Sequence, residues 1–166
     1  QLKIISFNRL LKNLNGLSVE DFLTQIKEKY ELKEVQKALV PSQKNEITLY
    51  ISKKWYSLIA KEDYVNRTHC VEKLDPAILS NNILAPILGI TDPRNDKRLA
   101  FIDGTYSLEE IKHRVDSEEF KAAFVLKPIS VNQIKEVADQ GQSMPPKSTY
   151  IQPKLRSGML IYDFKD

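Results

Sequence analysis

Apolar and polar residues alternate along this chain with two different periods, which predicts a domain built from both strands and helices. The clearest strand signal is at 46–52, where Ile47, Leu49 and Ile51 alternate with Thr48, Tyr50 and Ser52. A period of two is typical of a half-buried strand. The clearest helical signal follows Ser18, where apolar residues recur three and four positions apart. The fold class is therefore α+β or α/β.

The first half of the chain is expected to contain one helix and several strands. The predicted strands are 2–11, 31–39, 46–52 and 53–59. The helix begins after Ser18, a good N-cap residue, and runs to about Tyr30. Turn-forming residues fill 41–45, so we expect the strands on either side to form a hairpin.

The second half alternates helix and strand. Asp75-Pro76 predicts a helix start, and Pro86 should kink or stop that helix because proline has no backbone N–H to donate. Capping boxes at Ser107 and Ser130 each open a further helix, and Gly141 is well placed to end the second one. The strands predicted here are 99–102, 122–126 and 159–164.

Strands separated by helices of 10–12 residues predict a mixed sheet with helices packed on it and at least one parallel βαβ crossover. With 166 residues, the chain has the length of one ordinary domain. We expect a single domain over 1–166, with 1–73 and 74–166 as candidate subdomains. Because the chain begins at Gln1 and soon enters a strand, we also expect it to be the C-terminal portion of a longer protein.

Composition excludes some functions. The net charge is only +3, from 25 basic and 22 acidic residues, and the lysines are scattered, so we expect no nucleic-acid partner. Apolar runs are too short to cross a bilayer, so we expect no membrane association. The single cysteine, Cys70, excludes an internal disulfide and favours a cytoplasmic location.

The stretch 144–158 is the main candidate for a binding site. It contains three prolines and no carboxylate. Its basic residues are Lys147, Lys154 and Arg156, and Ser148 and Thr149 add hydroxyl donors. Such groups suit a phosphate or carboxylate, and the prolines lower the cost of ordering the loop. The alternative is a proline-stiffened connection with no ligand.

The same stretch resembles a P-loop in its spacing but not in its chemistry. Gly141, Lys147 and Ser148 match the motif, but Pro146 replaces the second glycine. A P-loop holds phosphate through backbone N–H groups, and proline has none. We therefore reject a Walker-type nucleotide site.

Three other residues are candidate ligand contacts. Asn8 and Arg9 form a polar pair at a strand end, where side chains often reach a site. Arg94 lies in the charged connection 92–98 and could contact an anion. Asp92 and Asp96 in that connection could hold magnesium, but they are also ordinary turn residues, and we predict no metal site.

Several stretches together resemble one family. Met144-Pro145-Pro146-Lys147-Ser148-Thr149-Tyr150, followed by Pro153-Lys154-Leu155 and Ser157-Gly158, is similar to the C-terminal signature of the bacterial and archaeal domain of unknown function 1015 family. Similar stretches also occur at 7–16, 84–96 and 123–128. One departure is Asp103, where relatives often have a second glycine, which weakens the case for a tight backbone contact at that turn.

The resemblance implies that this chain is the C-terminal half of a phosphate- or nucleotide-handling, kinase-like protein with an anion-binding loop at 144–158. Members carry an upstream Asp-Gly-His-His-Arg type motif, so the N-terminal half of the same protein is the expected partner. A small anionic metabolite is the expected ligand, and ATP or ADP with magnesium are candidate cofactors of the full-length protein. We expect no independent catalysis from this half. The alternative is a non-catalytic structural or protein-interaction module.

Overall fold

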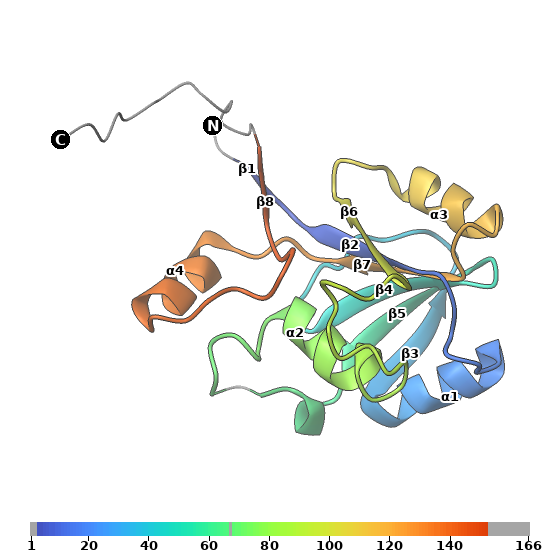
Figure 1. The fold of residues 1–166 in the computed structure, drawn as a ribbon, viewed down its shortest axis with the longest axis horizontal. Helices are drawn as coiled ribbons and strands as arrows, with labels where there is room; N and C mark the ends of the chain where they lie inside the picture. Colours follow the sequence, from blue (N-terminus) through green and yellow to red (C-terminus); the bar gives the residue numbers. More distant parts are fainter. Residues whose placement is uncertain (1–2, 67, 153–166) are drawn as a thin grey trace.

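A six-stranded sheet forms the centre of the molecule. The structure, a computed structural model, describes residues 3–66 and 68–152. Its strands are β2 (Phe7–Leu11), β3 (Tyr30–Val35), β4 (Glu46–Ile51), β5 (Lys54–Ala60), β6 (Leu99–Asp103) and β7 (Ala122–Leu126). They lie in the order β3-β5-β4-β7-β2-β6, so strands from both halves of the chain share one sheet (Figure 1).

All neighbouring strands in this sheet run antiparallel. The predicted parallel crossover is present in split form. Strand β2 pairs antiparallel with both β6 and β7, so these two run parallel to each other, and the helix α3 (Leu108–Asp116) connects them. The α+β class is confirmed. The sheet is mixed only in that β6 and β7 run parallel to each other on either side of β2.

The predicted hairpin between β3 and β4 is wrong. Strand β5 lies between them and pairs with both. Ser52 and Lys53 have φ values of 49° and 63°, which are typical of the two-residue turns whose twist matches a hairpin. The tight hairpin is therefore β4–β5, and the connection after β3 passes to the far side of β5.

Helices cover both faces of the sheet. Helix α1 (Val19–Lys29) and helix α2 (Asp75–Leu79) pack on one face, which we call the α1/α2 face, through residues such as Phe22, Ile26 and Ile78. Helix α3 packs on the other, which we call the α3 face, through Ile111 and Val115. Ser18 caps α1 as predicted, and both predicted capping boxes are present.

The hydrogen-bonding pattern of helix α2 changes from α-helical to π-helical before Pro86. After α2 the chain forms a π-helical turn, η2 (Ser80–Leu84). The N–H of Ala85 donates to the carbonyl of Ser80, five residues earlier, at 2.9 Å. Pro86 has no N–H, so the regular ladder cannot continue through it. The prediction that the helix ends or kinks at Pro86 is confirmed.

A two-stranded arm and one helix lie to the side of the sheet. Strands β1 (Lys3–Ile5) and β8 (Tyr150–Gln152) pair antiparallel and project from the sheet, next to helix α4 (Val131–Asp139) (Figure 1). Val131, the first residue of α4, is 68% exposed. A short 3-10 turn, η1 (Glu62–Tyr64), precedes α2. The strand predicted at 159–164 lies outside the described residues.

Candidate functional site

Strand β2 directs its two polar residues to opposite faces of the sheet. Arg9 lies opposite Phe101 and Phe124 in register, and both phenylalanines belong to the core on the α1/α2 face. Asn8 shares its face with Leu10, which packs in the core on the α3 face. The predicted Asn8-Arg9 pair therefore does not converge on one site.

Arg9 is a buried cation that holds the 145–150 turn. Its side chain is 3% exposed and donates hydrogen bonds to the carbonyls of Phe7 and Lys147, the latter at 3.2 Å. Its guanidinium carbon lies 5.3 Å from the centre of the Phe101 ring, which is cation–π distance. Arg9 thus ties the C-terminal segment to the sheet.

The charge of Arg9 is not neutralised by a described carboxylate. Burial lowers the pKa of Arg9 to about 9, and burial is the only cause of this shift. The guanidinium therefore remains protonated at neutral pH. A buried positive charge without an acidic partner raises the electrostatic potential around it and favours an anion nearby.

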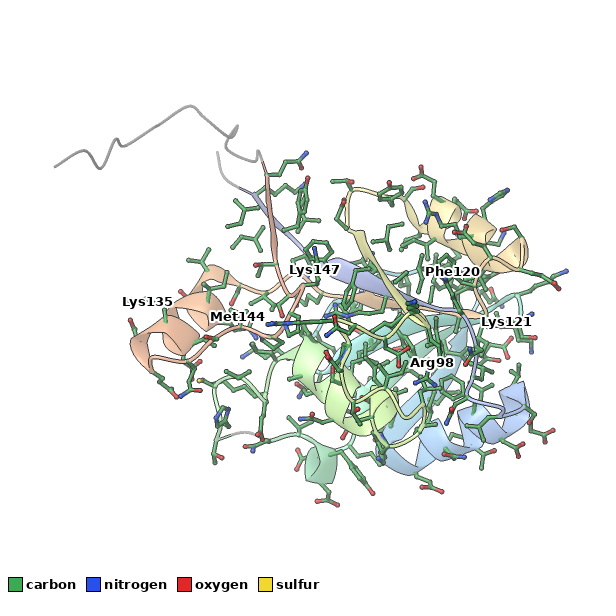
Figure 2. The ribbon with its side chains drawn as sticks, viewed as in Figure 1. Arg98, Phe120, Lys121, Lys135, Met144 and Lys147 are labelled. Carbon is green, nitrogen blue, oxygen red and sulfur yellow. The ribbon has the colours of Figure 1, made fainter. Side chains whose placement is uncertain are left out.

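The turn after α4 brings Lys147 next to Arg9. Lys147 has a φ of 50°, and its Nζ lies 5.5 Å from the centre of the Phe7 ring. Phe7 in turn meets Tyr150 edge-on, with ring centres 5.8 Å apart. Ser148 is buried and its hydroxyl donates to the carbonyl of Pro145 at 2.5 Å. Figure 2 shows Lys147 where the arm joins the sheet.

The structure brings some of the predicted site residues together. Arg9, Lys147 and Ser148 meet at this turn, and Thr149 is half-buried beside them. The hydroxyl of Ser148 is used within the turn, which makes it a structural donor. Lys154 lies outside the described residues.

Arg94 is not part of this group. It is exposed in the 92–96 turn, which leads into the Leu99 end of β6, whereas Phe7 pairs with the Asp103 end. Its neighbour Arg98 is committed to structure, because its guanidinium donates to Asp96 and to the carbonyl of Leu88. Asp92 accepts hydrogen bonds within its own turn, from Asn95 and from the backbone of Arg94.

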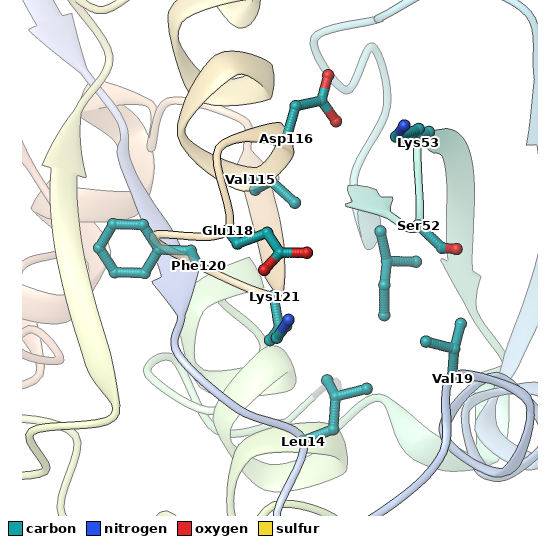
Figure 3. A pocket seen from close by; sticks show the side chains of 10 residues that line it. Leu14, Val19, Ser52, Lys53, Val115, Asp116, Glu118, Phe120 and Lys121 are labelled. Carbon is teal, nitrogen blue, oxygen red and sulfur yellow. The ribbon is translucent and has the colours of Figure 1, made fainter.

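A second, charged pocket lies at the opposite end of β2 (Figure 3). Its volume is about 290 Å³, with Leu14 and Phe120 in its apolar lining and Lys53, Glu118 and Lys121 among its charged side chains. Lys53 and Glu118 have positive φ values. Lys53 belongs to the β4–β5 turn, and Glu118 follows the end of α3, where left-handed residues are common. Both conformations are explained by local structure.

Sequence reasoning missed the aromatic side chains around Arg9. Phe7 and Arg9 are two positions apart on a strand and therefore share a face, a signal that was available in the sequence. Phe101 and Tyr150 come from distant strands, and only the pairing of β2 with β6 and of β1 with β8 brings them here.

Comparison with known families finds one similarity, over the first part of the chain. Residues 1–77 match the family described as "Protein of unknown function (DUF1015)". Over these residues, which make up slightly less than half of its length, the chain is similar to this family. No curated protein matches it. Among the described residues, no helix has both the length and the apolar character that a membrane crossing needs.

Solved structures of similar fold are longer than this chain. A conserved hypothetical protein from Pyrococcus furiosus has a TM-score of 0.55 at 15% identity, over 90% of this chain and 56% of its own. A mutant free serine kinase in complex with AMP has a TM-score of 0.53 at 16% identity, over 90% and 54%. A complex of a mutant free serine kinase with ADP has a TM-score of 0.50. The chain therefore shares their fold and spans about half of their length.

Proposed function

We propose that the Arg9–Lys147 region binds a phosphate or carboxylate group, and that the protein to which this chain belongs is a phosphate- or nucleotide-handling, kinase-like protein. The observation that carries the proposal is the buried Arg9, charged at neutral pH and hydrogen-bonded to the carbonyl of Lys147. The exposed side chain of Lys147 is free to approach a ligand from solvent.

The residues have separate roles in this proposal. Lys147 contacts the anion through its ammonium group, and Thr149 offers a hydroxyl donor. Arg9 is a positioning residue, because its donors hold the turn and its charge adds to the local potential. Their joint contribution is charge stabilisation by preplaced donors rather than proton transfer. Lys154 and Arg156 would add charge to the same segment.

The same proposal includes a cofactor and a partner for the full-length protein. ATP or ADP with magnesium would be bound by the full-length protein, with the N-terminal half as partner across a cleft. The likeness in fold to free serine kinases solved with AMP and ADP supports this, as does the length of those proteins. A small anionic metabolite would be the substrate.

The test is ligand-induced stabilisation of the full-length protein. Inorganic phosphate, phosphoserine and ADP are added separately, and the melting temperature is recorded. A ligand at a hundred times its Kd stabilises by about 2.7 kcal/mol. We expect this stabilisation in the natural protein and its loss in Lys147→Gln, which keeps a long polar side chain at the left-handed position.

The matched control is Lys135→Gln, which removes an exposed lysine from α4. It should leave the stabilisation unchanged. Equal stabilisation in Lys147→Gln and Lys135→Gln, or none with any of the three anions, contradicts the proposal.

A structural or protein-interaction module is the alternative function. It is favoured by the way the turn satisfies its own hydrogen bonds, since Arg9 donates to two carbonyls and Ser148 to a third. In this case Lys147→Gln and Ser148→Ala change stability only, and no anion stabilises the protein.

A further inference from the structure

Another pocket, separate from the charged pocket of Figure 3, opens on the α3 face. It lies on the other side of the sheet from the Arg9 side chain. Its volume is about 380 Å³, within the range of small-molecule sites. Its lining comes from five segments: β1, the start of β2, the connection after β3, the turn between β6 and α3, and the end of β7. Asn8, the other half of the predicted polar pair, belongs to this lining.

Two buried polar side chains line this pocket without using their donors within the described chain. Asn8 is 3% exposed, and its Oδ1 accepts the N–H of Leu126 at 3.1 Å, which leaves its Nδ2 without a partner. Ser6 is 6% exposed, and its backbone carbonyl accepts the N–H of Gly104 at 2.8 Å, which leaves its hydroxyl without one. Among the described residues, no unpartnered side-chain polar atom is completely enclosed, so both donors reach the surface of the pocket.

The position of the β6–α3 turn against Ser6 depends on Gly104. A Cβ atom at this position would lie 2.5 Å from the Cγ2 of Ile5 and 3.1 Å from the carbonyl oxygen of Ser6. Any side chain would therefore push the turn away from β2. Asp103 weakened the expectation of a tight backbone contact at this turn. The contact is present nevertheless, and Gly104 permits it because it has no side chain.

The rest of the pocket is mainly apolar. Leu108, Val125 and Pro128 contribute to its lining, and Val40 and Tyr106 lie on it while remaining 55% and 40% exposed. Exposed apolar side chains around buried donors are typical of a surface that a ligand covers.

The charges around the pocket disfavour a metal ion and give an anion little support. The N-terminus of α3 is already capped, because the Glu110 carboxylate accepts from the backbone and hydroxyl of Ser107. The lining contains no carboxylate, which a metal ion would need, and the free amide group of Asn8 can only donate. Lys3 is the one charged residue in the lining, and it is exposed.

We propose that this pocket binds a small neutral molecule with a carbonyl or similar acceptor on an apolar body. The acceptor takes hydrogen bonds from Asn8 Nδ2 and Ser6 Oγ, and the apolar body covers Val40, Tyr106 and Leu108. The site lies on the opposite face of the sheet from the Arg9 side chain, so the outcome of its test does not depend on the proposed anion site.

The test uses three ring compounds of similar size and backbone-amide NMR of the 166-residue chain. Benzamide offers a neutral carbonyl, benzoate an anion, and toluene no acceptor. We expect benzamide to shift the amide signals of Ser6, Asn8, Gly104 and Leu108 saturably, with a Kd on the order of 1 mM. Toluene should bind at least roughly tenfold more weakly, because it offers no acceptor to the two donors. Benzoate can accept from both donors, but it should also bind at least roughly tenfold more weakly, because no buried cation compensates the cost of removing its charge from water.

Two variants test the donors directly. Asn8→Asp keeps the acceptor for Leu126 but removes the N–H donor, and should weaken benzamide roughly tenfold. Ser6→Ala should weaken it severalfold while leaving the fold intact. Val131→Ala, on the exposed side of α4, is the matched control and should bind as the natural chain does.

Four results overturn the proposal. If toluene binds as tightly as benzamide, the pocket is only an apolar surface. If benzoate binds as tightly as benzamide, the pocket is an anion site. If both Ser6→Ala and Asn8→Asp bind benzamide as the natural chain does, the two donors take no part in binding. Failure of all three compounds to bind also overturns it.

Discussion

The two faces of β2 use neighbouring polar residues in opposite ways. On the α1/α2 face, Arg9 is buried and donates to two backbone carbonyls, so it holds a distant segment in place. On the α3 face, Asn8 is equally buried but uses only its acceptor, and Ser6 beside it leaves its hydroxyl unpartnered among the described residues. Burial is the same on both faces, but hydrogen-bond satisfaction is not.

The difference separates structural polar groups from candidate ligand contacts. A buried group whose donors are used stabilises the fold, and its loss leaves carbonyls unsatisfied. A buried group whose donors reach a pocket contributes less to stability, because it keeps contact with water there. The comparison predicts that substitutions at Arg9 lower the free energy of unfolding strongly, whereas substitutions at Ser6 lower it only slightly.

The largest effect is expected for Arg9→Ala. The substitution leaves two carbonyls and the ring of Phe101 without their buried partner, so the free energy of unfolding should fall by about 3 kcal/mol. Urea denaturation measures this. Lys12→Ala, at a nearby exposed position, should change it by less than about 0.5 kcal/mol. A small loss in Arg9→Ala would show that the turn holds without it.

A partly buried carboxylate at the start of α2 makes stability depend on pH. Burial raises the pKa of Asp75 to about 6, although its carboxylate accepts the N–H of Asn45 at 2.9 Å. The folded state therefore holds this proton more tightly than the unfolded state. The stabilisation is complete below about pH 4 and is lost as the pH rises through 6.

Asp75→Asn isolates that contribution, because the amide oxygen can still accept from Asn45. We expect the variant and the natural chain to be equally stable near pH 4, and the variant to be more stable by roughly 2 kcal/mol at pH 7. Urea denaturation at the two pH values measures the difference. Parallel pH curves would mean that Asp75 is hydrated in the folded state.

A smaller effect is expected at the rim of the α3-face pocket. Ser107→Ala removes the hydroxyl that accepts the N–H of Glu110 at the start of α3. The loss of an N-cap costs about 1 kcal/mol. Ser130→Ala on α4 removes a cap of the same type away from the sheet, and thermal unfolding of the two variants should show similar losses. A much larger loss at Ser107 would show that the pocket itself depends on the cap.

The smallest effect is expected for Ser6→Ala, at less than about 0.5 kcal/mol, because no described residue accepts from its hydroxyl. Thr48→Val is the matched comparison. Thr48 is buried on the same face, but its hydroxyl donates to the carbonyl of Leu39 at 2.8 Å, so the loss should be about 1 kcal/mol. Equal losses in urea denaturation would remove the distinction between used and unused donors.

Local signals were sufficient for most individual elements. Ser18, Ser107 and Ser130 predicted the helix starts, because each cap is a bond between residues three positions apart. Strand β7 was predicted at its observed bounds from its apolar run. The partner of β3 was predicted wrongly, because the strand that pairs with it depends on which turn is tightest.

The candidate sites were only partly accessible to such reasoning. Lys147 was found from the composition of its loop, but nothing local indicated that Arg9 would hold it through a contact spanning 138 positions. Asn8 was chosen as the partner of Arg9, yet the alternation of a strand sends adjacent side chains to opposite faces. The α3-face pocket combines five separate segments and has no signature in any one of them.

The sequence by itself determined the α+β class, the starts of the helices and the resemblance to one family, because caps, periodicity and motifs act over a few residues. Only the tertiary structure decided which strands pair, that Arg9 stabilises the 145–150 turn, and that Asn8 opens onto a different pocket. Strand order and burial arise from contacts between residues far apart in the chain, and the hydrogen-bond partners of a buried group are fixed only when those segments meet.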